Sequence, residues 1–413
     1  MRRTSRSSRR RPPAAAFAAL LALGCGSTEA DDGPEPIDVG RGDLVALDVG
    51  TFKVSSTGGD GVDVEFDVGG DVLSTVVVAA PAGDGVTVVA TELRDPGGER
   101  LLRLDTSNVD AVLPSLYASK VRAYPFLGPG PFALLFPGSP DQPAREGTYL
   151  ARYKVFGNDA QDVRFFTVQK RRQAGAGEPA SGKLPVTFWF AENDFLDAAS
   201  AAAGDARARP FLDALAELER IYGSAGIELG APSYRALPDE AARRFSVVEG
   251  DEFDELFSSV DTSETPGLNY FLVDSLEISS GGGTVVGLAN GIPGPPALRG
   301  LPGGGVVVSL LTLEIDPILV GQVMAHEGGH YLGLMHTTER DGTLFDLLDD
   351  TPECAASGYD VDGDQLVEAA ECASGGGADN LMFWSADGKP ERVSAGQRFV
   401  LLRSPTVDTS GAE

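Results

Sequence analysis

The pattern of apolar and polar residues divides the chain near residue 170. Over residues 37–169, short runs rich in Val, Thr and Phe are separated by Gly-Asp and Pro-Gly turn signals about every ten residues. Apolar and acidic residues alternate from Val62 to Val68, and Val86 to Thr91 is a more apolar run of strand-forming residues. This pattern predicts an antiparallel β-sandwich. We interpret it as a spacer or accessory domain, the alternative being a role in latency or substrate binding.

A mixed pattern of strands and helices follows from Leu184 onward. Leu184 to Ala191 is an apolar run typical of a buried strand, and Pro210 to Tyr222 has the apolar spacing of an amphipathic helix. We also expect strands near residues 269–273 and 305–311, and a helix that begins near Pro317. The chain is therefore predicted to be multidomain, with an α/β (α+β) domain over residues 184–413.

A linker is predicted between these two parts, over residues 170–183. Lys170-Arg171-Arg172 opens this stretch, and small residues with Gly and Pro follow. The basic triplet is also a candidate processing site, which would make the chain a latent proenzyme.

Residues 1–24 have the pattern of a secretory signal peptide. Six arginines and no acidic residue precede an apolar run from Ala14 to Gly24, which is too short to span a bilayer. The stretch Leu21-Ala22-Leu23-Gly24-Cys25 resembles a bacterial lipobox, which implies cleavage before Cys25, lipidation of its sulfur and a flexible tether over residues 25–36. Ala22 stands where leucine is commoner, so simple secretion is the alternative. Either outcome predicts an extracytoplasmic protein.

Charge and cysteine content fit that location. The chain has a net charge of -28, and loss of residues 1–24 would leave 27 basic against 61 acidic residues, a net charge of about -34. So acidic a surface repels nucleic acid and anionic lipid, so the predicted membrane contact is the lipid on Cys25 alone. The remaining cysteines, Cys354 and Cys372, predict one disulfide in an oxidising compartment, with two buried thiols as the alternative.

All three histidines lie in one stretch, residues 326–336, which reads HExxHxxGxxH. On a helix, His326 and His330 share a face and can bind one metal ion, and Glu327 lies beside them. Gly333 can adopt the left-handed conformation that ends a helix and returns the chain to supply His336. Three histidines leave a fourth zinc position open for water, which is typical of a catalytic zinc site.

With this stretch, the chain resembles the metzincin clan of zinc endopeptidases, and within it the pappalysin group. A methionine-bearing turn is expected beneath the metal, and Met382 in Asn380-Leu381-Met382-Phe383-Trp384 lies 46 residues after His336. The marks of the pappalysin group are Gly287-Leu288-Ala289 with Pro293, His336-Thr337, Asp350-Thr351-Pro352 and Ala395-Gly396-Gln397. The resemblance covers about residues 184–405 and none of the β-rich segment.

The resemblance implies a role for each matching residue. His326, His330 and His336 would bind zinc, Glu327 would be the general base, and Met382 would support the ligands from below. Trp384 stands where many clan members have a tyrosine that assists the oxyanion, and its indole N–H could donate a hydrogen bond. Asp387 would favour arginine or lysine after the scissile bond, the alternative being a surface turn at Asp387-Gly388.

A second metal site is predicted between the zinc motif and Met382. Residues 360–371 match an EF-hand calcium loop at the ligand positions, which are Asp360, Asp362, Asp364, Glu368 and Glu371. Gln365 stands where the turn glycine belongs. The alternative is a solvated acidic loop held by the disulfide.

These features together predict a secreted or lipid-anchored zinc endopeptidase that acts on protein or peptide substrates. Its zinc-bound water would attack the peptide bond, and Glu327 would take the proton. The alternative, from a different class, is an adhesin or binding lipoprotein that holds zinc but cleaves nothing.

Overall fold

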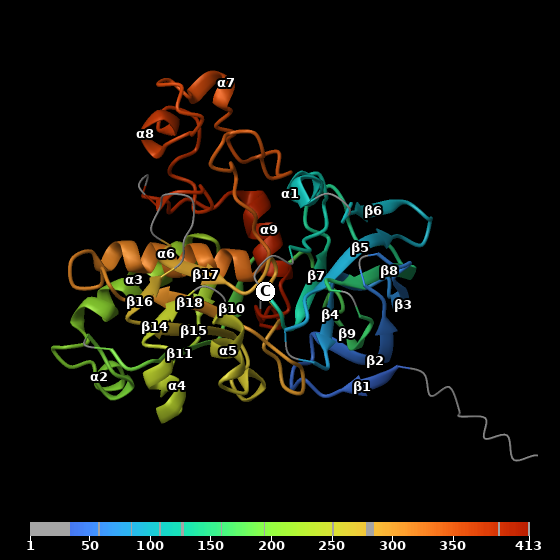
Figure 1. Cartoon of the computed structure of the whole chain (residues 1–413), viewed down its shortest axis with the longest axis horizontal. Coiled ribbons are helices and arrows are strands. Elements are labelled where there is room, and N and C mark those ends of the chain that lie inside the picture. Colours follow the sequence, from blue (N-terminus) through green and yellow to red (C-terminus); the bar gives the residue numbers. More distant parts are fainter. Residues whose placement is uncertain are drawn as a thin grey trace, which may run out of the picture. The chain divides into compact units, whose positions relative to one another are not determined.

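The computed structural model describes residues 34–411, apart from residues 57, 84, 107–108, 125–127, 158, 194, 250–251, 278–284 and 387–388. Residues Pro34–Glu413 form one compact unit. The predicted signal peptide, Cys25 and Asp387 lie outside the described residues. The described chain is a sheet-rich α+β protein with several sheets, which confirms the fold class at that level (Figure 1). Among the residues that the structure describes, no helix has the length and apolar character needed to cross a membrane.

Two antiparallel sheets form the β-rich part, residues 34–171, with strand orders β1-β2-β9-β4-β7 and β3-β8-β5-β6. The strands are β1 (Glu35–Ile37), β2 (Leu44–Val54), β3 (Val62–Val68), β4 (Val72–Pro81), β5 (Val88–Arg94), β6 (Arg100–Arg103), β7 (Phe132–Phe136), β8 (Gly147–Val155) and β9 (Gln161–Arg171). Both sheets contribute inward-facing side chains to one core, among them Phe66, Tyr149 and Phe165. Helix α1 (Val109–Tyr117), which the sequence pattern did not predict, lies between β6 and β7.

A five-stranded sheet with the order β13-β11-β15-β18-β17 forms the centre of the remaining chain. Its strands are β11 (Val186–Phe190), β13 (Ser233–Ala236), β15 (Leu268–Val273), β17 (Gly287–Ala289) and β18 (Val306–Ser309). All neighbours are parallel except β17, which runs antiparallel to β18 at the end of the sheet. The other strands, β10 (Gly182–Leu184), β12 (Ile227–Leu229), β14 (Val247–Glu249) and β16 (Ser275–Glu277), form two two-stranded sheets.

Helices cover both faces of this central sheet (Figure 1). They are α2 (Ala198–Ala203), α3 (Arg209–Ser224), α4 (Asp239–Arg244), α5 (Phe253–Ser258) and α6 (Pro317–Tyr331), with a short 3-10 helix at Thr262–Glu264. Strand side chains alternate between two cores: Phe188 and Tyr270 lie in the core shared with α3 and α6, whereas Phe271 lies in the core shared with α5. Both faces are therefore apolar, as expected for a mainly parallel sheet. The chain continues through α7 (Ala356–Tyr359), α8 (Ala369–Cys372) and α9 (Ala395–Arg403).

Lys170 connects the β-rich part to the last turn of α9 and the segment that follows it. It lies within β9, where the linker was expected to begin, and its side chain is fully buried. Its ammonium donates to the carbonyl oxygens of Leu402 at 2.7 Å, Ser404 at 3.0 Å and Val407 at 2.7 Å. A protease has no access to Lys170 in the folded chain, which argues against processing at that residue.

Candidate metal centre

Helix α6 carries His326 and His330 and ends where the motif requires. Its first turn is capped by the Asp316 carboxylate, which accepts a hydrogen bond from Leu319 N at 3.0 Å. Gly333 then adopts a φ of +110°, a conformation that a residue with a side chain rarely takes. This turn reverses the chain and brings His336 back towards the helix.

The three histidine side chains converge on one point. His336 Nε2 lies 3.3 Å from His326 Nε2 and 3.1 Å from His330 Nε2. His330 is buried, whereas His326 and His336 are partly exposed, so solvent can approach the convergence point from one side. The structure therefore brings together the three ligands predicted from the sequence.

Hydrogen bonds at the opposite ring nitrogens determine which tautomer each histidine adopts. His326 Nδ1 lies 2.7 Å from Leu381 O, and His330 Nδ1 lies 2.8 Å from Leu334 O. His336 Nδ1 lies 3.1 Å from a carboxylate oxygen of Glu339. Carbonyl and carboxylate oxygens only accept, so each Nδ1 carries a proton. In its neutral form each ring therefore points an unprotonated Nε2 at the other two.

This donor set fits zinc. Three unprotonated nitrogens without a proton between them repel one another, and a cation at the centre would relieve that repulsion. Two imidazole nitrogens bound to zinc at 2.0–2.1 Å in tetrahedral geometry lie about 3.3 Å apart, which matches the two distances above. Each ring also has the outer hydrogen bond that metal-binding histidines usually make.

The histidine pKa values differ according to their surroundings. Burial lowers the pKa of His326 to about 3 and that of His330 well below its usual value, so both rings are neutral at neutral pH. Burial also lowers the pKa of His336, but the charge of Glu339 and its hydrogen bond outweigh that effect and raise it overall.

Glu327 lies next to the histidines, on the same helix. Burial raises its pKa to about 7, although the charge of His336 and a backbone hydrogen bond from Ala289 act in the opposite direction. Strand β17 passes close by, because a Cβ atom at Gly287 would lie 2.7 Å from Glu327 Cγ. Glu327 thus lies beside the three histidines and against β17, the last strand of the central sheet.

Residues 380–384, the methionine turn, support the histidines directly. Leu381 provides the carbonyl that holds His326, and the fully buried Met382 packs against α6, where a Cβ at Gly329 would come within 2.7 Å of its sulfur. Asn380 orders the turn by accepting from Met382 N at 2.9 Å and from Gln397 Nε2 of α9 at 2.8 Å. The structure therefore places Met382 against the helix that carries His326 and His330.

Glu339 is a site residue that sequence reasoning missed. The charge and hydrogen bond of His336 lower the pKa of the Glu339 carboxyl to about 2, although burial alone would raise it. Tyr117 of α1 also donates a hydrogen bond to this carboxylate. The spacing of Glu339, three residues after His336, was a visible signal for its role. No signal in the sequence linked Tyr117 to residues more than 200 positions away.

The acidic loop, residues 360–371, brings three of its five predicted ligands together. Oxygen atoms of Asp360, Asp362 and Asp364 lie within 4.8 Å of one another. Gln365 has a φ of +70°, the conformation expected of the glycine that it replaces. Glu368 and Glu371 are not part of that group, because their carboxylates cap α8 and Glu371 also accepts from Val361 N at 2.7 Å.

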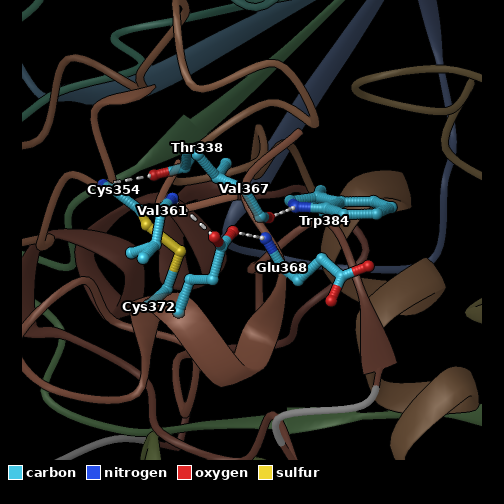
Figure 2. The surroundings of a disulfide bond; sticks show 8 residues. Thr338, Cys354, Val361, Val367, Glu368, Cys372 and Trp384 are labelled. Carbon is cyan, nitrogen blue, oxygen red and sulfur yellow. Dashed lines mark hydrogen bonds between the residues drawn. A yellow bond between two sulfur atoms is a disulfide. The ribbon is translucent and has the colours of Figure 1, made fainter. Parts of the chain in front are cut away.

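The Cys354–Cys372 disulfide forms as predicted and fastens the acidic loop at its base (Figure 2). Cys354 N donates to Thr338 Oγ1 at 3.0 Å, close in sequence to His336. The indole N–H of Trp384 donates to Val367 O at 2.7 Å (Figure 2). This hydrogen bond uses the only N–H of the indole, so Trp384 holds the loop against the methionine turn and does not offer that proton to a substrate.

Comparisons with known proteins do not identify the chain. No family model and no curated protein matches it. Among solved structures, endo-1,4-β-D-xylanase 10B of Clostridium thermocellum is 11% identical over 44% of this chain and 31% of that one, with a TM-score of 0.17. A GH87 α-1,3-glucanase from Streptomyces thermodiastaticus is 13% identical over 57% and 34%, with a TM-score of 0.16. The chain thus spans about a third of each of these proteins, and likenesses this weak carry no argument.

A Gly333→Ala substitution should weaken zinc binding. A Cβ at Gly333 would lie 2.8 Å from Leu135, and the left-handed backbone would be strained by about 1–3 kcal/mol, so relief of both would move His336. Gly157→Ala is the matched control, because Gly157 has a φ of +130° and open space around it. Competition with a chromophoric chelator should show weaker zinc binding for the Gly333 variant alone. Equal affinities in both variants would contradict this account of the turn.

Proposed function

We propose that the chain is a zinc-dependent endopeptidase with a metzincin-like catalytic domain, most similar to the pappalysin group. The observation that carries the proposal is the convergence of three imidazole Nε2 atoms on one point, with the Glu327 carboxylate beside them on the same helix. A zinc site that served structure alone would need a fourth protein ligand and no base. This combination favours an enzyme over the alternative of a non-catalytic zinc-containing adhesin or binding lipoprotein.

Each residue has a definite part in the proposed reaction. Zinc, when bound, would polarise the peptide carbonyl and acidify water. Glu327 would accept a proton from the attacking water and deliver it to the leaving amine, a role for which a pKa near the working pH is best suited. Leu381, Leu334 and Glu339 would keep the three imidazoles oriented through their Nδ1 hydrogen bonds.

Strand β17 offers a binding surface for an extended peptide. It is the last strand of the central sheet, so one of its edges has no partner strand among the described residues. Backbone groups at such an edge can pair with a peptide as an added strand. Because Gly287 lies against Glu327, a peptide bound along β17 would pass close to the proposed base and the metal ligands.

The location proposed for the enzyme is outside the cytoplasm. A disulfide at Cys354–Cys372 supports an oxidising compartment, since cytosolic thiols are kept reduced. The lipid anchor on Cys25 stays a prediction.

Loss of the Glu327 carboxylate should strongly reduce peptide cleavage but leave zinc binding intact. The wild type, Glu327→Gln and Glu314→Gln would be incubated with a mixed peptide library, and new termini would be read by mass spectrometry. Glu314 is an exposed residue outside the site, so its variant should cleave like the wild type. Cleavage by the Glu327 variant should fall by about 10²- to 10⁴-fold with one zinc retained. A wild type that holds one zinc and makes no cuts would support the binding lipoprotein instead.

Calcium is proposed as a second cofactor, at the acidic loop. Three aspartates with oxygens within 4.8 Å and the left-handed Gln365 support this proposal. The alternative, a solvated loop, is supported by the hydrogen bonds that Glu371 already makes to backbone amides. Isothermal titration calorimetry with Ca²⁺ should show one binding site in the wild type and none in Asp362→Asn. No heat of binding in the wild type would contradict the calcium proposal and favour the solvated loop.

A further inference from the structure

We propose that the β-rich part of the chain belongs to the metal site, because Tyr117 of α1 positions Glu339 and, through it, the ligand His336. This inference rests on the proposed zinc site. Under this inference, residues 37–169 are not a spacer but help to position His336.

His336 is the ligand that most needs outside support. His326 and His330 are fixed to one helix, and their Nδ1 atoms donate to backbone carbonyls. His336 lies beyond the helix, and its Nδ1 partner is a side chain, Glu339, whose carboxylate can rotate. The orientation of His336 therefore depends on what holds the Glu339 carboxylate.

Tyr117 holds that carboxylate from the β-rich part. Its hydroxyl donates to Oε1 of Glu339, the same oxygen that accepts from His336 Nδ1. Only 4% of Tyr117 is exposed, and its ring packs with Ile292 and Met335. Burial raises the pKa of Tyr117, so the hydroxyl keeps its proton and remains a donor. Tyr117, Glu339 and His336 thus form a continuous series of hydrogen bonds to the metal position.

Helix α1 is itself fixed in the core of the β-rich part. Val112 and Leu116, on the same helix, are buried in the core between the two antiparallel sheets. Tyr117, the last residue of α1, belongs instead to the small cluster next to the metal centre. A rigid scaffold therefore presents the hydroxyl, which is what a positioning residue requires.

Two further contacts hold the β-rich part in place at this site. Leu135 of β7 lies over the turn at Gly333, within 2.8 Å of where a Cβ would be. Tyr124 N donates to Ile292 O at 3.0 Å, in the segment that follows β17. The β-rich part thus contacts the chain on both sides of His336, at Gly333 and at Glu339. It also contacts the segment directly after β17, the proposed substrate-binding strand.

The test measures zinc affinity in purified full-length variants by competition with a chromophoric chelator. The variants are the wild type, Tyr117→Phe, Glu339→Ala and the double variant. Tyr153→Phe is the matched control: Tyr153 is a fully buried tyrosine of the same β-rich part, and its hydroxyl has no hydrogen-bond partner among the described residues. Thermal unfolding of each metal-free variant reports whether it is folded.

We expect Tyr117→Phe to weaken zinc binding about 3- to 10-fold and Glu339→Ala about 10- to 100-fold, since loss of groups that orient a ligand costs up to that much. The double variant should bind no more weakly than Glu339→Ala alone, because Tyr117 acts through that carboxylate. Tyr153→Phe should bind zinc like the wild type.

The outcomes separate this inference from the proposed function. A wild type that binds no zinc would overturn the proposed function, and the inference with it. A wild type that binds zinc with a Tyr117→Phe variant of equal affinity would overturn the inference alone. Additive losses in the double variant would also overturn it, because a merely structural effect of Tyr117 would not depend on Glu339.

Discussion

The proposed metal centre depends on one constraint, which is that three imidazole rings must direct unprotonated Nε2 atoms at the same point. Such an arrangement is unfavourable without a cation, so the surrounding chain has to hold it in place. It does so because the Nδ1 atoms donate hydrogen bonds to Leu381 O in the methionine turn, to Leu334 O after the helix and to the Glu339 carboxylate. The loop after α6 and the methionine turn must therefore both be in place before the three histidines are oriented.

Close packing around α6 also helps to hold the histidine rings in position. Glycines inside a helix each cost about 1 kcal/mol relative to alanine, and two of them, Gly328 and Gly329, lie within α6 between His326 and His330. A Cβ at Gly328 would come within 2.3 Å of the Tyr222 hydroxyl, and one at Gly329 would meet Met382. The absence of side chains lets α3, β15 and the methionine turn approach the helix closely. The two glycines thus lower the intrinsic stability of the helix but permit the close contacts that fix His326 and His330.

The parts of this architecture that could be predicted are those with a local signal. Strict alternation predicted β3 and helical spacing predicted α3. The HExxHxxGxxH stretch predicted that the three histidines come together after a turn at Gly333. Gln365 takes the left-handed conformation usual for the glycine at this position of a calcium loop, although it is not a glycine.

The parts that could not be predicted depend on contacts between distant segments. Helix α1 has a proline inside it and follows a run of strands, so local propensity argued against it. The contact of Tyr117 with Glu339, the burial of Lys170 by the carbonyls near residue 404, and the use of the Trp384 indole by Val367 appear only once the chain is folded.

The most direct test of the account is X-ray absorption spectroscopy at the zinc edge on the zinc-loaded protein. The account predicts three imidazole nitrogens at about 2.0–2.1 Å and one further light ligand, in four-coordinate geometry. Sulfur ligands, a shell of oxygens without imidazole scattering, or a fourth protein nitrogen that closes the site would contradict it.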